Sequence, residues 1–222
     1  MDNNHPILPP HHSALRRFRL VYTGTLWNLT SIEPVVAAIE KLQAESPDVP
    51  DRLELVCVGR KTSPQQAILD RIGRTRCRLE NMDYCERKQA LRLMSHADAL
   101  LLLLSDVPAA ERVAPAKLFE YLAIARPILA ATPEGETASI VRRFLLKSHF
   151  TPSDVSGIAS WIASQVTEWQ RTGRANDMTH DSTAIAPFTR RHQASQLATL
   201  LERTVSPLAP AGGERRNRNK TR

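Results

Sequence analysis

The sequence predicts an α/β protein built on one doubly wound parallel sheet. Two observations support this prediction: short apolar segments alternate with amphipathic ones along most of the chain, and the apolar segments have the length of single strands. Ala99–Leu104, an unbroken apolar run, is typical of a strand that is buried on both faces. Because parallel strands are joined by crossover helices, the strict alternation indicates helices on both faces of the sheet.

The alternation sets the expected positions of the elements. Strands are expected at residues 19–24, 53–59, 78–82, 99–104 and 128–131. Helices are expected at residues 30–45, 64–72, 87–95, 115–124, 136–146, 153–171 and 188–205. At the first helix, Thr30 followed three residues later by Glu33 has the pattern of a capping box.

Length and composition are ordinary for one globular domain. The chain has 222 residues, of which 42% are hydrophobic and 24% are charged. We expect the folded domain to span residues 16–206, between a disordered arm at 1–15 and a disordered basic tail at 207–222. No apolar run is long enough to cross a membrane and no secretion signal is visible, so we expect a cytoplasmic protein, with the inner face of the membrane as an alternative location.

Cysteine usage also fits a cytoplasmic protein. Cys57, Cys77 and Cys85 are odd in number and lack the spacing of metal ligands. We therefore expect reduced thiols and no metal site. The chain also lacks the glycine-rich loops that cradle ATP or a dinucleotide, so no cofactor is expected.

The positive charge of the chain is concentrated at its C-terminal end. The formal net charge is +7, and the segment from Leu208 onward holds five basic residues and one acidic residue. The rest is close to neutral, which argues against a specific nucleic-acid reader. A basic tail of this kind is typical of a solvated segment, with peripheral association with an anionic membrane as the alternative.

Residues 113–130 carry the most informative pattern. Pro115 is suited to the first position of a helix, whose start offers free N–H groups and the positive end of the helix dipole to an anion. Lys117 adds a positive charge one turn in, and Glu120, on the same face, is able to accept hydrogen bonds from two hydroxyls. The pattern predicts a diphosphate site beside a sugar-diol site. An ordinary exposed ion pair between Lys117 and Glu120 remains the alternative.

This region and its surroundings resemble a known family. Pro115-Ala-Lys-Leu-Phe-Glu-Tyr-Leu-Ala, followed by Arg126-Pro-Ile-Leu-Ala, is similar to the donor-sugar signature of retaining GT-B glycosyltransferases of the family 4 type. Phe18–Gly24 and Leu53–Gly59 resemble the first two strands of that family's C-terminal domain, and Phe188–Ala198 resembles its closing helix. The similar segments follow the family's order along most of the chain.

The resemblance implies one half of a GT-B fold: a single Rossmann-like, doubly wound parallel sheet with C-terminal helices that binds a nucleotide sugar. It implies that Glu120 binds the ribose and that the helix start lies against the diphosphate. Arg112 departs from the family, which has a second glutamate there, with Glu111 one place off. Ala125 stands in place of a glycine. The similarity covers only the second of the two domains of a GT-B enzyme.

The implied function is sugar transfer from a nucleoside-diphosphate sugar to a saccharide or lipid-linked acceptor, as in polysaccharide biosynthesis. Because no acceptor-binding domain is matched, the chain alone is expected to be inactive. A subunit of a split glycosyltransferase, completed by a partner chain, and a non-catalytic nucleotide-sugar-binding module from a truncated gene are the alternatives. The closing helix would expose Leu197, Leu200 and Leu201, which predicts pairing with a partner chain or a second copy.

Further candidates come from the carboxyl ends of the strands, where open α/β sheets bind their ligands. Gly24 and Thr25 follow the first strand, and Arg60 and Lys61 follow the second, although plain turn and surface roles explain both pairs equally well. No catalytic base or nucleophile is identifiable. The expected substrate-binding residues are Gly24, Thr25, Arg60, Lys61, Pro115, Lys117, Leu118 and Glu120.

Overall fold

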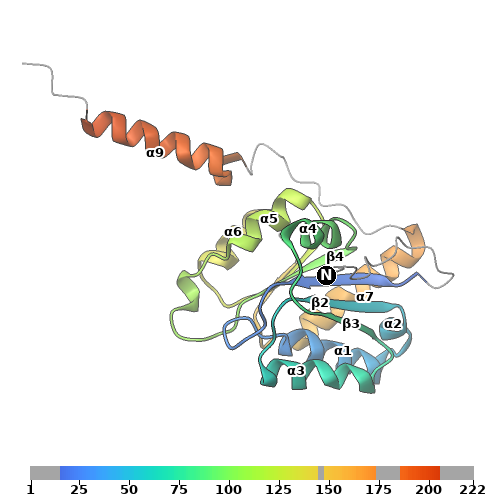
Figure 1. Cartoon of the computed structure of the whole chain (residues 1–222). Coiled ribbons are helices and arrows are strands. Elements are labelled where there is room, and N and C mark those ends of the chain that lie inside the picture. The colour runs from blue at the N-terminus through green and yellow to red at the C-terminus, as the bar shows by residue number, and fades with distance from the viewer. Residues whose placement is uncertain (1–15, 145–147, 174–185, 206–222) are drawn as a thin grey trace, which may run out of the picture. The chain divides into compact units, whose positions relative to one another are not determined.

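The computed structural model describes residues 16–144, 148–173 and 186–205 (Figure 1). The chain divides into two units, Met1–Asp181 and Ser182–Arg222. The arm predicted at 1–15 and the tail predicted at 207–222 lie outside the described residues. The first unit contains the sheet, and the second contains the closing helix.

The first unit is built on six parallel strands in the order β3-β2-β1-β4-β5-β6. The strand order reverses on either side of β1, as in a doubly wound sheet, so the predicted fold class is confirmed. The four strands of the centre are buried along their whole length. The strands are β1 (Phe18–Thr23), β2 (Leu53–Val58), β3 (Arg78–Met82), β4 (Ala99–Leu103), β5 (Ile128–Ala131) and β6 (His149–Phe150).

The sixth strand is absent from the sequence prediction. β6 contains only two residues and pairs with the last two residues of β5. Two residues are too few to show an alternating or apolar pattern, so only the pairing with β5 defines this strand.

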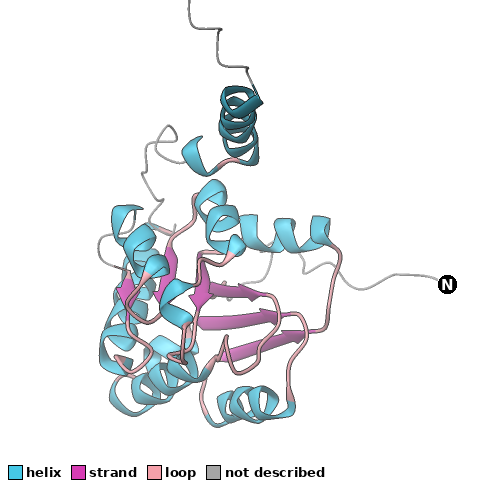
Figure 2. Ribbon diagram, turned by 90° about the vertical axis from the view of Figure 1, so that its left-hand side faces the viewer, coloured by secondary structure: helices cyan, strands magenta, loops and turns pink. Residues whose placement is uncertain are grey.

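Helices cover both faces of the sheet (Figures 1 and 2). One face packs against α1 and α7, and the other packs against α4 and α5. Each lies close to its predicted position. The helices of the first unit are α1 (Glu33–Glu45), α2 (Asp48–Asp51), α3 (Ser63–Asp70), α4 (Arg87–Ser95), α5 (Ala116–Ile124), α6 (Glu136–Phe144) and α7 (Val155–Thr172), with short 3-10 turns η1 (Arg71–Arg74) and η2 (Ala110–Arg112).

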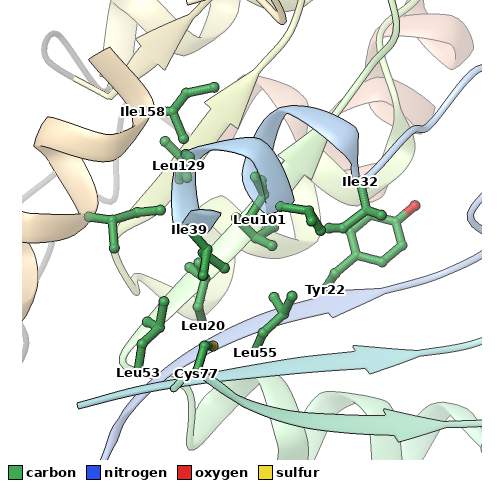
Figure 3. Packing of buried hydrophobic residues seen from close by; sticks show 14 of the residues in the cluster. Leu20, Tyr22, Ile32, Ile39, Leu53, Leu55, Cys77, Leu101, Leu129 and Ile158 are labelled. Atoms are coloured by element: carbon green, nitrogen blue, oxygen red, sulfur yellow. The ribbon is translucent and has the colours of Figure 1, made fainter. Parts of the chain in front are cut away.

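The main hydrophobic core lies between the sheet and α1 and α7 (Figure 3). Alternate residues of the strands, such as Leu20 and Tyr22 of β1, point into it together with Ile39 of α1 and Ile158 of α7. All of these side chains are at most 1% exposed. Because the core fixes the centre of the sheet, the loops at the strand ends are held on a rigid base.

The start of α1 differs from the predicted capping box. The helix begins at Glu33, and its N-cap is Ile32, which has no capping side chain of its own. The Thr30 hydroxyl instead donates to the Thr25 carbonyl at 2.6 Å. The Ile32 N–H is satisfied by the side-chain oxygen of the buried Gln65, 2.9 Å away. The Ser31 hydroxyl accepts from the Glu33 N–H at 3.2 Å, so a local side chain and a residue distant in sequence share the capping of this helix.

The second unit contains η3 (Ala186–Phe188) and α9 (Arg190–Val205), the predicted closing helix. Its three leucines are exposed: Leu197, Leu200 and Leu201. None of the helices in the described part of the chain combines the length and apolar character needed to cross a bilayer.

Candidate functional site

The carboxyl ends of β1 and β4 mark the point where the strand order reverses, which is where open α/β sheets bind ligands. Gly24 follows β1 with φ of +133°, and Gly59 follows β2 with φ of +129°. These backbone conformations strongly favour glycine. A β-carbon on Gly59 would overlap the carbonyl of Gly24, so the two turns touch backbone to backbone.

The turns after β1 and β2 are joined by hydrogen bonds. The Leu26 N–H donates to the Arg60 carbonyl at 2.9 Å, and the Thr62 N–H donates to the Leu26 carbonyl at 3.1 Å. The structure therefore brings Gly24 and Thr25, which the sequence singled out at the end of the first strand, next to Arg60 and Lys61, which it singled out at the end of the second.

The two cations of the second turn have different surroundings. Arg60 is exposed. The Lys61 ammonium is half-buried and donates to the carbonyls of Gly59, at 2.8 Å, and Met82, at 2.5 Å. Burial lowers the pKa of Lys61, while the Cys57 thiol and the Asp83 carboxylate oppose this shift. The Lys61 ammonium thus bonds to carbonyls at the ends of β2 and β3, whereas the Arg60 guanidinium is the more accessible of the two charges.

The start of α5 lies beside this edge, one residue later than predicted. Pro115 is the N-cap, with φ of −62° and ψ of +131°, and Ala116 is the first helical residue. In the described part of the chain, the N–H groups of Ala116 and Lys117 bond to no backbone carbonyl, so they are available to an anion. Leu118 is different: its N–H donates to the Pro115 carbonyl at 3.0 Å and its side chain is fully buried.

Lys117 reaches from α5 to the end of β1. Its ammonium donates to the Thr23 carbonyl, lies directly over Gly24, and sits 4.3 Å from the centre of the Tyr22 ring. Burial lowers the pKa of Lys117 to about 8, while the Glu120 carboxylate acts in the opposite direction. Because Lys117 forms no ion pair with a described residue, an anion at this edge would supply a counter-charge in direct contact with its ammonium.

Glu120 lies one turn further along α5. Its carboxylate is 2.8 Å from the Arg87 guanidinium at the start of α4, and its side chain is 39% exposed. Among the described residues, no ion pair joins Lys117 to Glu120. The ordinary pair between them is therefore not formed: Lys117 turns to β1 and Glu120 to α4, and both stay near the same helix start.

Two tyrosines anchor this arrangement, and neither was singled out from the sequence. The Tyr22 hydroxyl donates to the Thr25 carbonyl at 2.9 Å, and the Tyr121 hydroxyl lies 3.3 Å from that of Thr23. Burial raises the pKa of Tyr22 to about 12 and also raises that of Tyr121, so both hydroxyls keep their protons at neutral pH. Tyr121 lies four residues after Lys117 on one helix, and this spacing was the signal in the sequence that could have placed it beside Lys117.

The loop before α5 is fixed from the neighbouring turn. Gly135, with φ of +145°, packs so closely on the backbone of Glu111 that a β-carbon there would overlap it. The Thr137 hydroxyl donates to the Val113 carbonyl. Arg112, at the position where the resemblance to GT-B enzymes implied a glutamate, is 84% exposed and pairs loosely with Glu111 at 3.4 Å. No cluster of metal-ligating side chains occurs within the described ranges.

Comparison with known proteins identifies the fold. No protein-family model matches the chain, and no curated protein matches it in sequence. Solved structures do match. A UDP-forming α,α-trehalose-phosphate synthase from Burkholderia vietnamiensis superposes with a TM-score of 0.61 and 13% identity over 86% of this chain and 45% of that one. Anabaena HepE in complex with UDP gives a TM-score of 0.60 and 18% identity over 85% and 49%.

A third structure, the catalytic domain of cholesterol-α-glucosyltransferase from Helicobacter pylori, gives a TM-score of 0.53 and 15% identity over 78% of this chain and 99% of that one. The chain has the fold of one half of a GT-B glycosyltransferase. It spans about half the length of the first two structures. At these identities, the similarity establishes the fold alone.

Proposed function

We propose that this chain is the donor-binding half of a retaining glycosyltransferase of the family 4 type. Its ligand is a nucleoside-diphosphate sugar, and the sugar passes to a saccharide or lipid-linked acceptor. The observation that carries the proposal is the placement of Lys117 and Glu120 at the start of α5, beside the glycine turn of β1 at the switch point of the sheet.

The chemistry of the edge fits a diphosphate. Among the described residues, the N–H groups of Ala116 and Lys117 at the start of α5 bond to no backbone carbonyl, and the Lys117 ammonium lies over Gly24, so donors and a positive charge gather at one place. Arg60 is the further cation within the same pair of joined turns. As the bond to the sugar breaks, negative charge grows on the departing diphosphate, and fixed donors at this position stabilise it.

Glu120 is the group suited to the ribose. Its carboxylate is partly exposed and has a cation on only one side, which leaves acceptor sites for two hydroxyl donors. The nucleotide would then lie along α5, with its diphosphate at the helix start and its ribose one turn further. HepE, of similar fold, was solved in complex with UDP, which supports a nucleotide as the ligand proposed for this chain.

The coverage of the related structures favours a half-enzyme. Because the chain spans about half of two glycosyltransferase-like structures, we propose that the acceptor is held by a second domain or a partner chain. Holding both reactants together contributes roughly 7–11 kcal/mol to such reactions. We therefore expect the chain alone to bind nucleotide but not to transfer sugar. Efficient transfer by a monomeric chain would contradict the half-enzyme proposal.

Calorimetric titration with a panel of nucleoside diphosphates and their sugars tests the proposal directly. Glu120→Ala should weaken binding of the preferred nucleotide sugar by about 1.5–3 kcal/mol, because a charged acceptor of ribose hydrogen bonds is lost. Arg87→Ala is the matched control, since it removes the same ion pair and leaves the carboxylate in place. Equal losses in the two variants would show that Glu120 serves only its ion pair. No binding of any nucleotide would reject the function.

A further inference from the structure

The helix α6 (Glu136–Phe144) connects the sixth strand with the loop that leads to α5. It packs against β6 and also against η2, which lies in that loop. The start of α6 holds the loop directly: the Thr137 hydroxyl donates to the Val113 carbonyl, and the backbone at Gly135 lies against that of Glu111. The placement of α6 therefore sets the path of the chain into the start of α5.

His149 links α6 to the end of the sheet. Its Nε2 lies 3.1 Å from the Thr132 carbonyl and 3.1 Å from the Thr132 hydroxyl, directly after β5. Its Nδ1 lies 3.4 Å from the Arg142 guanidinium in the last turn of α6. Arg142 also pairs with Glu134, in the loop between β5 and α6. All of these contacts lie within the unit Met1–Asp181, and they give the two-residue strand β6 a connection to the helix.

The link requires a neutral imidazole with its proton on one particular nitrogen. A guanidinium only donates hydrogen bonds, so Nδ1 of His149 accepts from Arg142, and Nε2 carries the proton and donates to the Thr132 carbonyl. Burial lowers the pKa of His149 and the Arg142 charge acts in the same direction, whereas the bond to Thr132 and the Glu134 carboxylate act against it. At neutral pH, His149 is therefore able to accept on one side and donate on the other.

We propose that His149 is a positioning residue for the nucleotide-sugar site. By bonding to the end of β5 and to α6 at once, it fixes α6 on the sheet, and α6 in turn holds the loop before the N–H groups of Ala116 and Lys117. His149 acts through Thr137 and Gly135 and does not contact the ligand. The inference rests on the proposed function for the identity of that ligand, but the link between His149 and the start of α5 has a test of its own.

Three variants separate positioning from stability. His149→Ala removes both hydrogen bonds and should weaken binding of the preferred nucleotide sugar at pH 7.5 by about three- to tenfold in calorimetric titration. His149→Gln keeps one donor and one acceptor and should bind like the parent. His96→Ala is the matched control and should also bind like the parent, because His96 caps α4 and bonds to the Arg92 carbonyl of its own helix. A His149→Ala protein that binds as tightly as the parent, with only its melting temperature lowered, overturns the inference.

The variant Thr137→Val tests the other end of the link. It removes the hydroxyl that bonds to the Val113 carbonyl and keeps a side chain of similar shape. Binding should weaken by a similar factor, about three- to tenfold. The double variant His149→Ala/Thr137→Val should lose clearly less than the product of the two single losses, because both substitutions release the same loop. Losses that simply multiply would show that His149 does not act through α6.

Hydrogen exchange of the ligand-free protein tests the link independently of the nucleotide. The Val113 N–H donates to the Ala110 carbonyl and the Leu118 N–H donates to the Pro115 carbonyl, each at 3.0 Å, so both report on the loop and the helix start. His149→Ala should speed their exchange by about three- to tenfold, and His149→Gln should not. Exchange that His149→Ala leaves unchanged overturns the inference. The expected exchange in a parent chain that binds no nucleotide sugar would support the link and reject the proposed function alone.

Discussion

Charged side chains are arranged differently at the two ends of the parallel strands. We call the end where the strands begin the amino edge and the end where they finish the carboxyl edge. At the amino edge, Arg19 and Glu54 form a buried ion pair of 2.7 Å, and the side chains are 9% and 5% exposed. Asp98 accepts from the Arg19 N–H at 2.9 Å and from Arg16 at 3.1 Å. At the carboxyl edge, Lys61 and Lys117 form no ion pair with any described residue, and both ammonium groups bond to strand-end carbonyls.

The contrast separates charges that serve the fold from charges available to a ligand. A buried ion is tolerated only when paired, which is how the amino edge is built. A cation that bonds only to carbonyls and to an aromatic ring gains from an anionic ligand, which is the situation of Lys117. Removing charges from the amino edge should therefore cost stability, whereas changes at the carboxyl edge should chiefly affect binding.

The largest effect is expected at the amino edge. Glu54→Gln leaves the buried Arg19 charge without its carboxylate and should lower the free energy of unfolding by about 3–5 kcal/mol. Denaturant titration measures the change. The double variant Arg19→Met/Glu54→Leu should recover most of the loss, because no unpaired buried charge remains: Arg78, the second partner of Glu54, is exposed and keeps its pair with Glu80. A Glu54→Gln protein as stable as the parent would show that the pair is not the structural element inferred here.

The contact between the two glycine turns should come next. Gly59→Ala forces a β-carbon into the Gly24 carbonyl at a positive φ, which should lower the free energy of unfolding by about 1–3 kcal/mol and distort the candidate phosphate site. Gly73→Ala is the control, since a β-carbon at Gly73 meets nothing within 4 Å. Thermal unfolding of the two variants should differ clearly, and similar melting temperatures would argue against a close contact between the turns.

The pH dependence of nucleotide-sugar binding tests the role of the Lys117 charge at the carboxyl edge. The pKa of Lys117 is lowered to about 8 by burial, so the ammonium is charged below that pH and loses its proton above it. A diphosphate favours the charged form, so the dissociation constant of a nucleotide sugar should be flat below about pH 7.5 and rise by up to about tenfold per pH unit above pH 8. Lys117→Met should bind more weakly and show no such rise. A profile unchanged by this substitution would remove Lys117 from the site.

The smallest effect is expected where α5 returns to the amino edge. Ala125 ends the helix in the left-handed conformation, with φ of +59°, at a position where glycine is the usual residue. Ala125→Gly should raise the free energy of unfolding by about 0.5–1 kcal/mol and leave nucleotide affinity unchanged. Lower stability would indicate that the flexibility of glycine in the unfolded chain outweighs the relief of the left-handed alanine.

The apolar pattern of the sequence determined the fold class and most elements. Continuous apolar runs such as Ala99–Leu104 specify buried strands wherever they occur, and the intervening helices follow from the connection rules of parallel sheets. The rule that ligands bind at the carboxyl ends of strands singled out the loops after β1 and β2, and the bond between Leu26 and Arg60 joins these two loops. These features are local in origin, or follow from topology, and so can be derived before the structure is known.

Tertiary structure alone decided how the charged groups are paired. The sequence places Lys117 and Glu120 one turn apart, but it was packing that directed Lys117 to the Thr23 carbonyl and Glu120 to Arg87, over separations of many residues. The cap of α1 by Gln65 and the two-residue strand β6 likewise depend on neighbours distant along the chain. The formation of a hydrogen bond or an ion pair depends on differences in distance of a few tenths of an ångström. Burial of an apolar residue requires only that it lie on the correct face of its helix or strand. The apolar pattern can therefore be read from the sequence, whereas the pairing of charged groups cannot.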